Sequence, residues 1–255
     1  MSNNYLQNIE KTRNTKEQLS FYEQLTNFIE TSDEPLLSKF RAFSVYTPRQ
    51  AITVFLERYE IFKLIKNTPG SIVECGVGSG QGLMAFAHFC SIFEPYHYTR
   101  KVIGFDTFEG FTGITDKDKT SKAAHMVEGG LNYSGYEKMV KAAELYDQNR
   151  TLGHIPKIDL VKGDISQTFP KYLEKNPALV IGLLYLDLDL YQPTIDTIKL
   201  AIKRLPKGAV ICFDELNHKD YPGETLAVIE SLGLENIRLR RLDMASMMSY
   251  AIIGE

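Results

Sequence analysis

Two apolar runs in the second half of the chain each end in a pair of acidic residues. The runs cover residues 180–186 and 209–213. The acids that follow them are Asp187, Asp189, Asp214 and Glu215. Continuous apolar runs are typical of central parallel strands buried on both faces. Because the carboxyl ends of such strands meet at one edge of the sheet and face the ligand crevice, we expect Asp187, Asp214 and Glu215 to converge there.

Acids that converge in this way favour a metal ion. Two like charges about 4 Å apart repel by roughly 4 kcal/mol at an effective dielectric of about 20, unless they take up protons or bind a cation. All-oxygen ligands favour Mg²⁺, then Ca²⁺ or Mn²⁺. We expect Asp187, Asp214 and Glu215 to be the ligands. The alternative is that these acids only cap loops and face solvent.

A glycine-rich stretch covers residues 71–82, with the sequence Ser-Ile-Val-Glu-Cys-Gly-Val-Gly-Ser-Gly-Gln-Gly. It predicts a strand, a tight turn and a helix, the arrangement of a nucleotide-side loop in an α/β fold. The glycines do not fit G-x-G-x-x-G, and no Lys-Ser/Thr pair follows as in a P-loop. The remaining pattern, Glu74 followed by Gly76, Gly78 and Gly80, resembles the cofactor loop of class I S-adenosylmethionine (SAM) methyltransferases.

Two further acids follow predicted strands on the cofactor side. Asp106 ends the strand expected at 101–106, where it could accept hydrogen bonds from both ribose hydroxyls of an adenosyl group or cap a helix. Asp164 follows the strand expected at 158–162. It could meet the adenine edge, cap the short helix that begins near Ser166, or do both.

Methyl transfer to a hydroxyl group would use both sites. A protonated hydroxyl is a poor nucleophile, and Mg²⁺ would stabilise the developing alkoxide and position the oxygen. A base must take the proton. Asp189 is close enough to Asp187 for that role, and His218 is the rival base.

The remaining pattern predicts one large α/β domain with an N-terminal helical extension. Residues 1–70 are expected to be helical, chiefly at 17–29 and 49–65, and either cover the active site or form a dimer contact. Residues 71–255 are expected to form the catalytic domain, with a sheet of seven mostly parallel strands and helices on both faces. The polar segment 112–136 is longer than an ordinary connection. It predicts a mobile lid.

Composition limits the class of protein. The chain has 255 residues and a formal net charge of −3, which gives no general attraction to nucleic acid or anionic membrane. No apolar run is long enough for a transmembrane helix, and residues 1–8 lack a signal-peptide core. The three cysteines are far apart in sequence, which predicts buried thiols in a reducing, cytoplasmic compartment.

Three segments make a family resemblance specific. Residues 105–111 (Phe-Asp-Thr-Phe-Glu-Gly-Phe), 185–191 (Tyr-Leu-Asp-Leu-Asp-Leu-Tyr) and 213–215 (Phe-Asp-Glu) follow the glycine loop in this order and resemble the macrocin O-methyltransferase family. The resemblance covers roughly residue 45 to the end. Family members are Rossmann-like class I enzymes (EC 2.1.1), including sugar O-methyltransferases of antibiotic pathways that act on deoxysugars.

The resemblance also implies roles for individual residues. It implies Mg²⁺ at Asp187, Asp214 and the position of Glu215, where many members carry a second Asp, and Asp189 as general base. It implies that SAM is bound by Glu74, Gly76, Gly78, Gly80, Asp106, Thr107 and Asp164.

The function expected from the sequence is therefore SAM- and Mg²⁺-dependent O-methylation of a deoxysugar, most simply a 6-deoxyhexose carried on dTDP. Methylation of a catechol or another small phenol is the close alternative, since two adjacent hydroxyls could chelate Mg²⁺ in either substrate. A non-catalytic protein that binds SAM or a nucleotide is a second alternative. An NAD-dependent oxidoreductase is a third, disfavoured by the glycine register.

Overall fold

The computed structural model describes residues 15–255 apart from residues 122, 134 and 246. The chain divides into two compact units, a first unit that ends at Ile52 and a second that runs from Thr53 to Glu255. The sequence-based boundary between extension and catalytic domain lay instead at residue 70. The difference arises because the second half of one long N-terminal helix packs into the core of the second unit.

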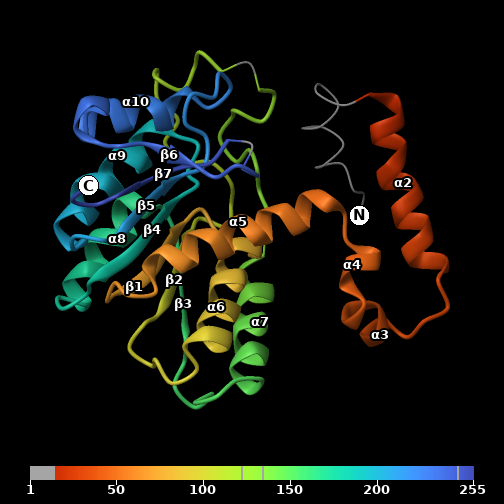
Figure 1. Cartoon of the computed structure of the whole chain (residues 1–255). Helices are drawn as coiled ribbons and strands as arrows, with labels where there is room; N and C mark the ends of the chain where they lie inside the picture. The colour runs from red at the N-terminus through yellow and green to blue at the C-terminus, as the bar shows by residue number, and fades with distance from the viewer. Residues whose placement is uncertain (1–14, 122, 134, 246) are drawn as a thin grey trace. The chain divides into compact units, whose positions relative to one another are not determined.

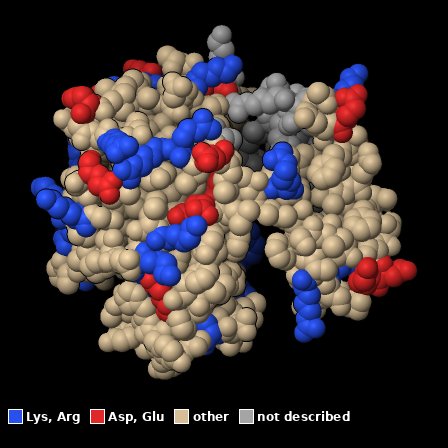
Figure 2. Space-filling model, in the orientation of Figure 1, with Lys and Arg blue, Asp and Glu red and all other residues tan. Residues whose placement is uncertain are grey.

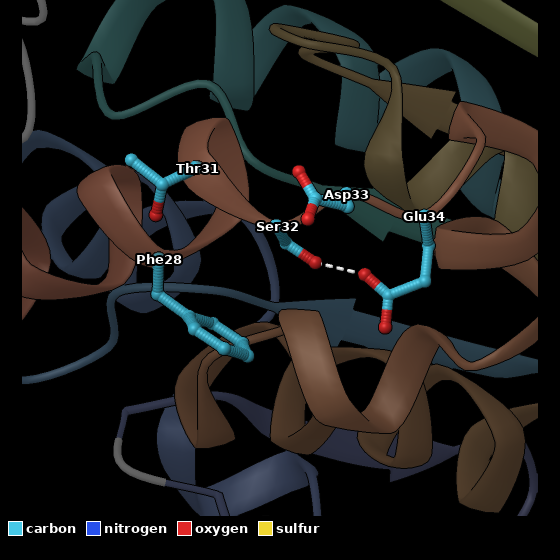
Figure 3. A pocket seen from close by; sticks show the side chains of 5 residues that line it. All are labelled: Phe28, Thr31, Ser32, Asp33 and Glu34. Atoms are coloured by element: carbon cyan, nitrogen blue, oxygen red, sulfur yellow. Dashed lines mark hydrogen bonds between the residues drawn. The ribbon is translucent and has the colours of Figure 1, made fainter.

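The first unit is helical. It contains α2 (Lys16–Thr31), α3 (Leu36–Arg41), α4 (Phe43–Tyr46) and the start of α5 (Arg49–Ile65). Helix α2 begins with a capping box, in which Thr15 and Gln18 satisfy each other's backbone N–H groups. A pocket at the end of α2 is lined by Phe28, Thr31, Ser32, Asp33 and Glu34 (Figure 3). None of these is a predicted site residue.

A seven-stranded sheet forms the centre of the second unit (Figure 1). Its strands are β1 (Ser71–Cys75), β2 (Val102–Asp106), β3 (Ile158–Lys162), β4 (Ile181–Leu186), β5 (Val210–Phe213), β6 (Arg240–Arg241) and β7 (Ser249–Ile252). The strand order is β3-β2-β1-β4-β5-β7-β6. Strands β1 to β5 pair in parallel, and β7 pairs antiparallel with both β5 and β6. The predicted Rossmann-like class I fold is confirmed.

Helices cover both faces of this sheet (Figure 1). One face packs against α5, α6 (Gln81–Phe93) and α7 (Tyr136–Gln148), with a core that includes Phe62 and Phe86. The other packs against α8 (Ile165–Lys175), α9 (Tyr191–Ala201) and α10 (Pro222–Ser231), with Phe169 and Ile198 in the core. The 3₁₀ turns η1 (Ile202–Arg204) and η2 (Leu234–Asn236) complete the second unit. Successive strand residues face opposite cores, as strand periodicity requires.

Most predicted bounds agree with the structure to within a few residues. Strand β3 and helix α5 have the predicted limits, 158–162 and 49–65. The helix predicted at 17–29 is α2, which is slightly longer at Lys16–Thr31. Helices α3 and α4 were not predicted, because each is too short to show helical periodicity.

The segment predicted as a lid is closed at its base. The Phe111 N–H donates to the Gly130 carbonyl, and the Gly129 N–H donates to the Phe111 carbonyl. Inside this loop Asp118 is fully buried, and it accepts hydrogen bonds from the N–H groups of Thr115 and Tyr191 at 2.8 Å. The loop is therefore anchored to the start of α9. Its movement over a ligand stays a prediction.

Candidate active site

The glycine loop and Asp187 lie side by side at the carboxyl edge of the sheet. The Asp187 N–H donates to the Cys75 carbonyl at 2.8 Å, and a Cβ on Gly76 would lie only 1.7 Å from the Asp187 carbonyl oxygen. Strand β1 lies between β2 and β4, so the order of the strands reverses here. Ligands of open α/β sheets bind in the crevice outside such a switch point.

Asp106 shapes the glycine loop. Its Oδ2 accepts the N–H groups of Val77 and Gly78, both at 2.8 Å, and its Oδ1 accepts the N–H of Phe108. Neither expected role, ribose binding or helix capping, included this contact. A carboxylate has further lone pairs for ribose hydroxyls, so the contact and the predicted role are compatible.

Glu74 lies beneath the first turn of α6. A Cβ on Gly82 would come within 1.9 Å of Glu74 Oε1, and only 2% of the Glu74 surface is exposed. Burial raises the pKa of Glu74 to about 8, against the opposing charge of Arg58. The structure thus places this carboxyl in the interior behind the loop.

The other predicted cofactor residues occupy turns. Gly78 and Gly80 both have positive φ, at 52° and 92°, which favours glycine. The Thr107 hydroxyl donates to the Gly110 carbonyl at 2.7 Å and closes the turn after β2. Asp164 caps α8 by accepting the Ser166 N–H at 2.9 Å, which confirms the capping role. The adenine contact stays a prediction.

The three acids that were expected to converge lie around a common centre. Single carboxylate oxygens of Asp187, Asp214 and Glu215 all lie within 4.8 Å of one another. Burial, followed by the charges of neighbouring acids, raises the pKa values of Asp187 and Glu215 well above the usual range. Glu215 Oε2 is buried without a hydrogen-bond partner. A hard cation would supply the missing partner, so this donor set fits Mg²⁺.

Asp189 lies beside this group and is 7% exposed, with φ at +61°, a conformation that non-glycine residues rarely adopt. Burial raises the pKa of Asp189 to about 7, and the neighbouring Glu215 carboxyl opposes this rise.

Arg58 of α5 is the buried counter-charge of this cluster, and sequence reasoning missed it. Its guanidinium lies 3.7 Å from Asp214 Oδ1 and 3.9 Å from the centre of the Tyr185 ring. The Tyr185 hydroxyl donates to the same Asp214 oxygen. Nothing in the sequence around Arg58 distinguishes it from a solvated helix residue. The only available signal was that several buried acids need a cation.

His218 belongs to a separate aromatic group. Its ring lies 5.1 Å from that of Tyr221, centre to centre, and its Nδ1 accepts the Asp220 N–H at 3.2 Å. The Tyr221 hydroxyl in turn lies 2.7 Å from His125 Nε2, in the lid segment. His218 is therefore placed by the loop after β5, and its role as base stays a prediction.

Comparison with known proteins identifies the class. The family model described as Macrocin-O-methyltransferase (TylF) matches residues 10–228. The chain belongs to this macrocin O-methyltransferase family, and it is an O-methyltransferase. No curated protein sequence gave a match.

Solved structures agree with this assignment. A crystal structure of CalS11, calicheamicin methyltransferase, matches with a TM-score of 0.89 and 31% identity over 95% of each chain. The apo structure of CalS11, described as TDP-rhamnose 3'-O-methyltransferase of calicheamicin biosynthesis, matches with a TM-score of 0.82 and 31% identity, covering 95% of this chain and 97% of that one. The O-methyltransferase NovP shares the fold, with a TM-score of 0.60 and 20% identity over 76% and 78% of the two chains.

Family membership supports SAM as the cofactor. The residues at the switch point fit it, because a loop of positive-φ glycines lies next to Asp187, and an acid ends the neighbouring strand. No described helix has the length and apolar character needed to cross a membrane. On the face shown in Figure 2, basic and acidic side chains are interspersed.

Proposed function

We propose that this protein transfers a methyl group from SAM to a hydroxyl of a deoxysugar, with Mg²⁺ as cofactor, and that the acceptor is a 6-deoxyhexose carried on dTDP. The observation behind the sugar is the similarity to a TDP-rhamnose 3'-O-methyltransferase over nearly the whole chain. The observation behind the metal is the group of three acids with a buried, unpartnered carboxylate oxygen. The three acids and the glycine loop both lie at the switch point, where an acceptor could approach the methyl donor.

In this proposal SAM lies over the glycine loop. Gly76, Gly78 and Gly80 allow SAM to approach the backbone closely. Asp106 accepts hydrogen bonds from the backbone of this loop, and in this proposal it also accepts hydrogen bonds from the ribose hydroxyls. Glu74, Thr107 and Asp164 complete the proposed cofactor set. Bound SAM supplies a methyl carbon already activated by its sulfonium, so the protein's contribution is orientation and electrostatics.

Asp187, Asp214 and Glu215 would hold Mg²⁺, which supplies stabilisation of a developing alkoxide. Tyr185 and Arg58 both bind Asp214 Oδ1, which orients this carboxylate and leaves its second oxygen for the ion. Outer contacts of this kind commonly fix the geometry of metal ligands.

Asp189 would be the general base. Its pKa of about 7 lies close to neutral pH, where an acceptor of protons works best. It lies next to Asp187 and Glu215, so in this proposal it would accept the proton of a sugar hydroxyl held at the metal site. His218 is the rival base.

The test is a methyl-transfer assay with SAM and Mg²⁺ that compares dTDP-sugars with catechols. We expect transfer to a dTDP-6-deoxyhexose and none to catechols. Asp189→Asn should lower kcat by about 10²–10⁴-fold with SAM affinity retained. His218→Ala is the matched control and should keep most activity. Transfer to catechols alone, or a larger loss in the His218 variant, would contradict the proposal.

We also propose a homo-oligomer in the cytoplasm. The first unit exposes several large apolar side chains, with Leu37 77% and Phe40 66% exposed, which a second copy could cover. Light scattering of the purified protein tests this, since a monomer at working concentration would exclude it. The three buried, unbonded thiols support a reducing compartment.

A further inference from the structure

Two side chains in the first turn of α10 accept hydrogen bonds from the backbone of the loop that carries Asp214 and Glu215. Glu224 Oε1 accepts the N–H of Glu215 at 3.0 Å, and Thr225 Oγ1 accepts the N–H of Asn217 at 2.9 Å. Asn217 has φ at +64°, so this short loop turns sharply and depends on such contacts. Two neighbouring side chains of α10 therefore set where the proposed metal ligands point.

Glu224 is buried to an unusual degree for an acid. None of its surface is exposed, and its second oxygen, Oε2, has no hydrogen-bond partner among the described residues. Its neighbour Glu215 also has a buried, unpartnered Oε2. A buried carboxylate oxygen without a partner is costly. Two in one place indicate a cationic group that belongs there when the protein works.

The charges nearest to Glu224 are negative. Those that act on it most strongly are Asp214 and Asp189. The buried cation of this region, Arg58, is already engaged by Asp214 and the Tyr185 ring. Glu224 is not one of the three acids that share a common centre, so it lies outside the proposed ligand set.

We infer that Glu224 is a positioning residue of the metal site, which holds the Glu215 backbone by one oxygen and adds a negative charge behind the ligands that raises affinity for the divalent cation. This inference rests on the proposed function. It assigns to Glu224 two effects with opposite consequences. Burial and the neighbouring acid Asp214 disfavour the charged carboxylate of Glu224 in the metal-free protein, and the same negative charge strengthens binding of Mg²⁺.

The variant that separates these effects is Glu224→Gln. Glutamine keeps a carbonyl oxygen to accept the Glu215 N–H and removes only the charge. Calorimetric titration of SAM-free protein with Mg²⁺ should show a Kd raised about 10- to 100-fold, the usual cost of changing an outer partner of a metal ligand. The Tm of the metal-free variant should equal or exceed that of the native protein. SAM affinity should stay within about twofold.

The matched control is Glu230→Gln on the same helix. Glu230 is exposed and bonds to Lys117 and Tyr191 on the surface, so its neutralisation should leave Mg²⁺ affinity unchanged. If Glu224→Gln binds Mg²⁺ as tightly as this control, Glu224 has no role in the site. If its metal-free Tm falls together with Mg²⁺ affinity, Glu224 serves folding and the inference is wrong. If the native protein binds SAM but not Mg²⁺, the proposed metal fails, and this inference with it.

Discussion

Removal of the Arg58 charge should destabilise the metal-free protein severely. Arg58 is 6% exposed, and its guanidinium faces Asp214 across 3.7 Å and covers the Tyr185 ring. Arg58→Met keeps most of the side-chain volume and part of the contact with the ring. It leaves the surrounding acids without their buried counter-charge.

The magnitude follows from the separation of the charges. At 3.7 Å and an effective dielectric of about 20, Coulomb's law gives about 4.5 kcal/mol for the pair. Loss of one partner of a buried ion pair typically costs about 3–5 kcal/mol, because the other charge stays buried and unpaired. We therefore expect the free energy of unfolding to fall by about 3–5 kcal/mol.

Urea unfolding in EDTA near neutral pH measures this, followed by far-UV circular dichroism because the chain has no tryptophan. Lys63→Met is the control on the same helix, since Lys63 forms a surface pair with Glu60 and its loss should not move the midpoint. Saturating Mg²⁺ should restore part of the stability of Arg58→Met. An Arg58→Met midpoint equal to that of the control would refute the electrostatic account of this cluster.

Two further predictions concern the buried acids and the lid. Burial raises the pKa values of Asp189 to about 7 and Glu74 to about 8, so the folded protein holds protons that the unfolded chain has released. In EDTA, this stability is greatest below about pH 4 and is lost as pH rises through about 7–8, so Tm should fall from about pH 5 to about pH 8.5. Saturating Mg²⁺ should flatten this slope. Separately, Asp118→Ala removes the buried anchor of the lid segment, which should lower the free energy of unfolding by about 1–3 kcal/mol and speed tryptic cleavage within residues 112–136.

Each of these has its own control. The pH scan is repeated with Asp189→Asn, which cannot titrate at that position and should show a shallower slope in EDTA. A slope unchanged by both Mg²⁺ and this substitution would contradict the assignment to buried acids. For the lid, Asp116→Ala changes an exposed acid two positions away and should leave the cleavage rate unaltered. Equal cleavage of the two variants would show that Asp118 does not anchor the segment.

The sequence predicted the parts of the site that follow local signals. Asp187 and Asp214 each end an uninterrupted apolar run, and such runs form parallel strands whose carboxyl ends must share an edge. The glycine loop is likewise a continuous motif. The position of the acids at one edge of the sheet therefore followed from pattern and topology.

The residues that sequence reasoning missed act across long separations. Arg58 reaches the site from α5, and Asp118 anchors the lid segment to the start of α9. Glu224 contacts the loop of the proposed metal ligands from α10, where its spacing indicates only the first turn of a helix. Asp106 shows another limit. Its position at the end of β2 was predicted, but its bonds to the glycine loop depend on the close approach of two strand ends. Such contacts are set by packing, which no local pattern records.

The three cysteines are divided between the two faces of the sheet, so their reactivity reports on each face separately. Cys75 faces the core beneath α8, α9 and α10, whereas Cys90 and Cys212 lie in the core beneath α5, α6 and α7. All three thiols are free and buried, and burial raises their pKa values, so the native protein should resist alkylation. Pulsed alkylation with mass spectrometry would then show which side of the sheet opens first. A cysteine introduced at the surface would be the one thiol that reacts with a fluorescent label, ready to follow the lid in solution.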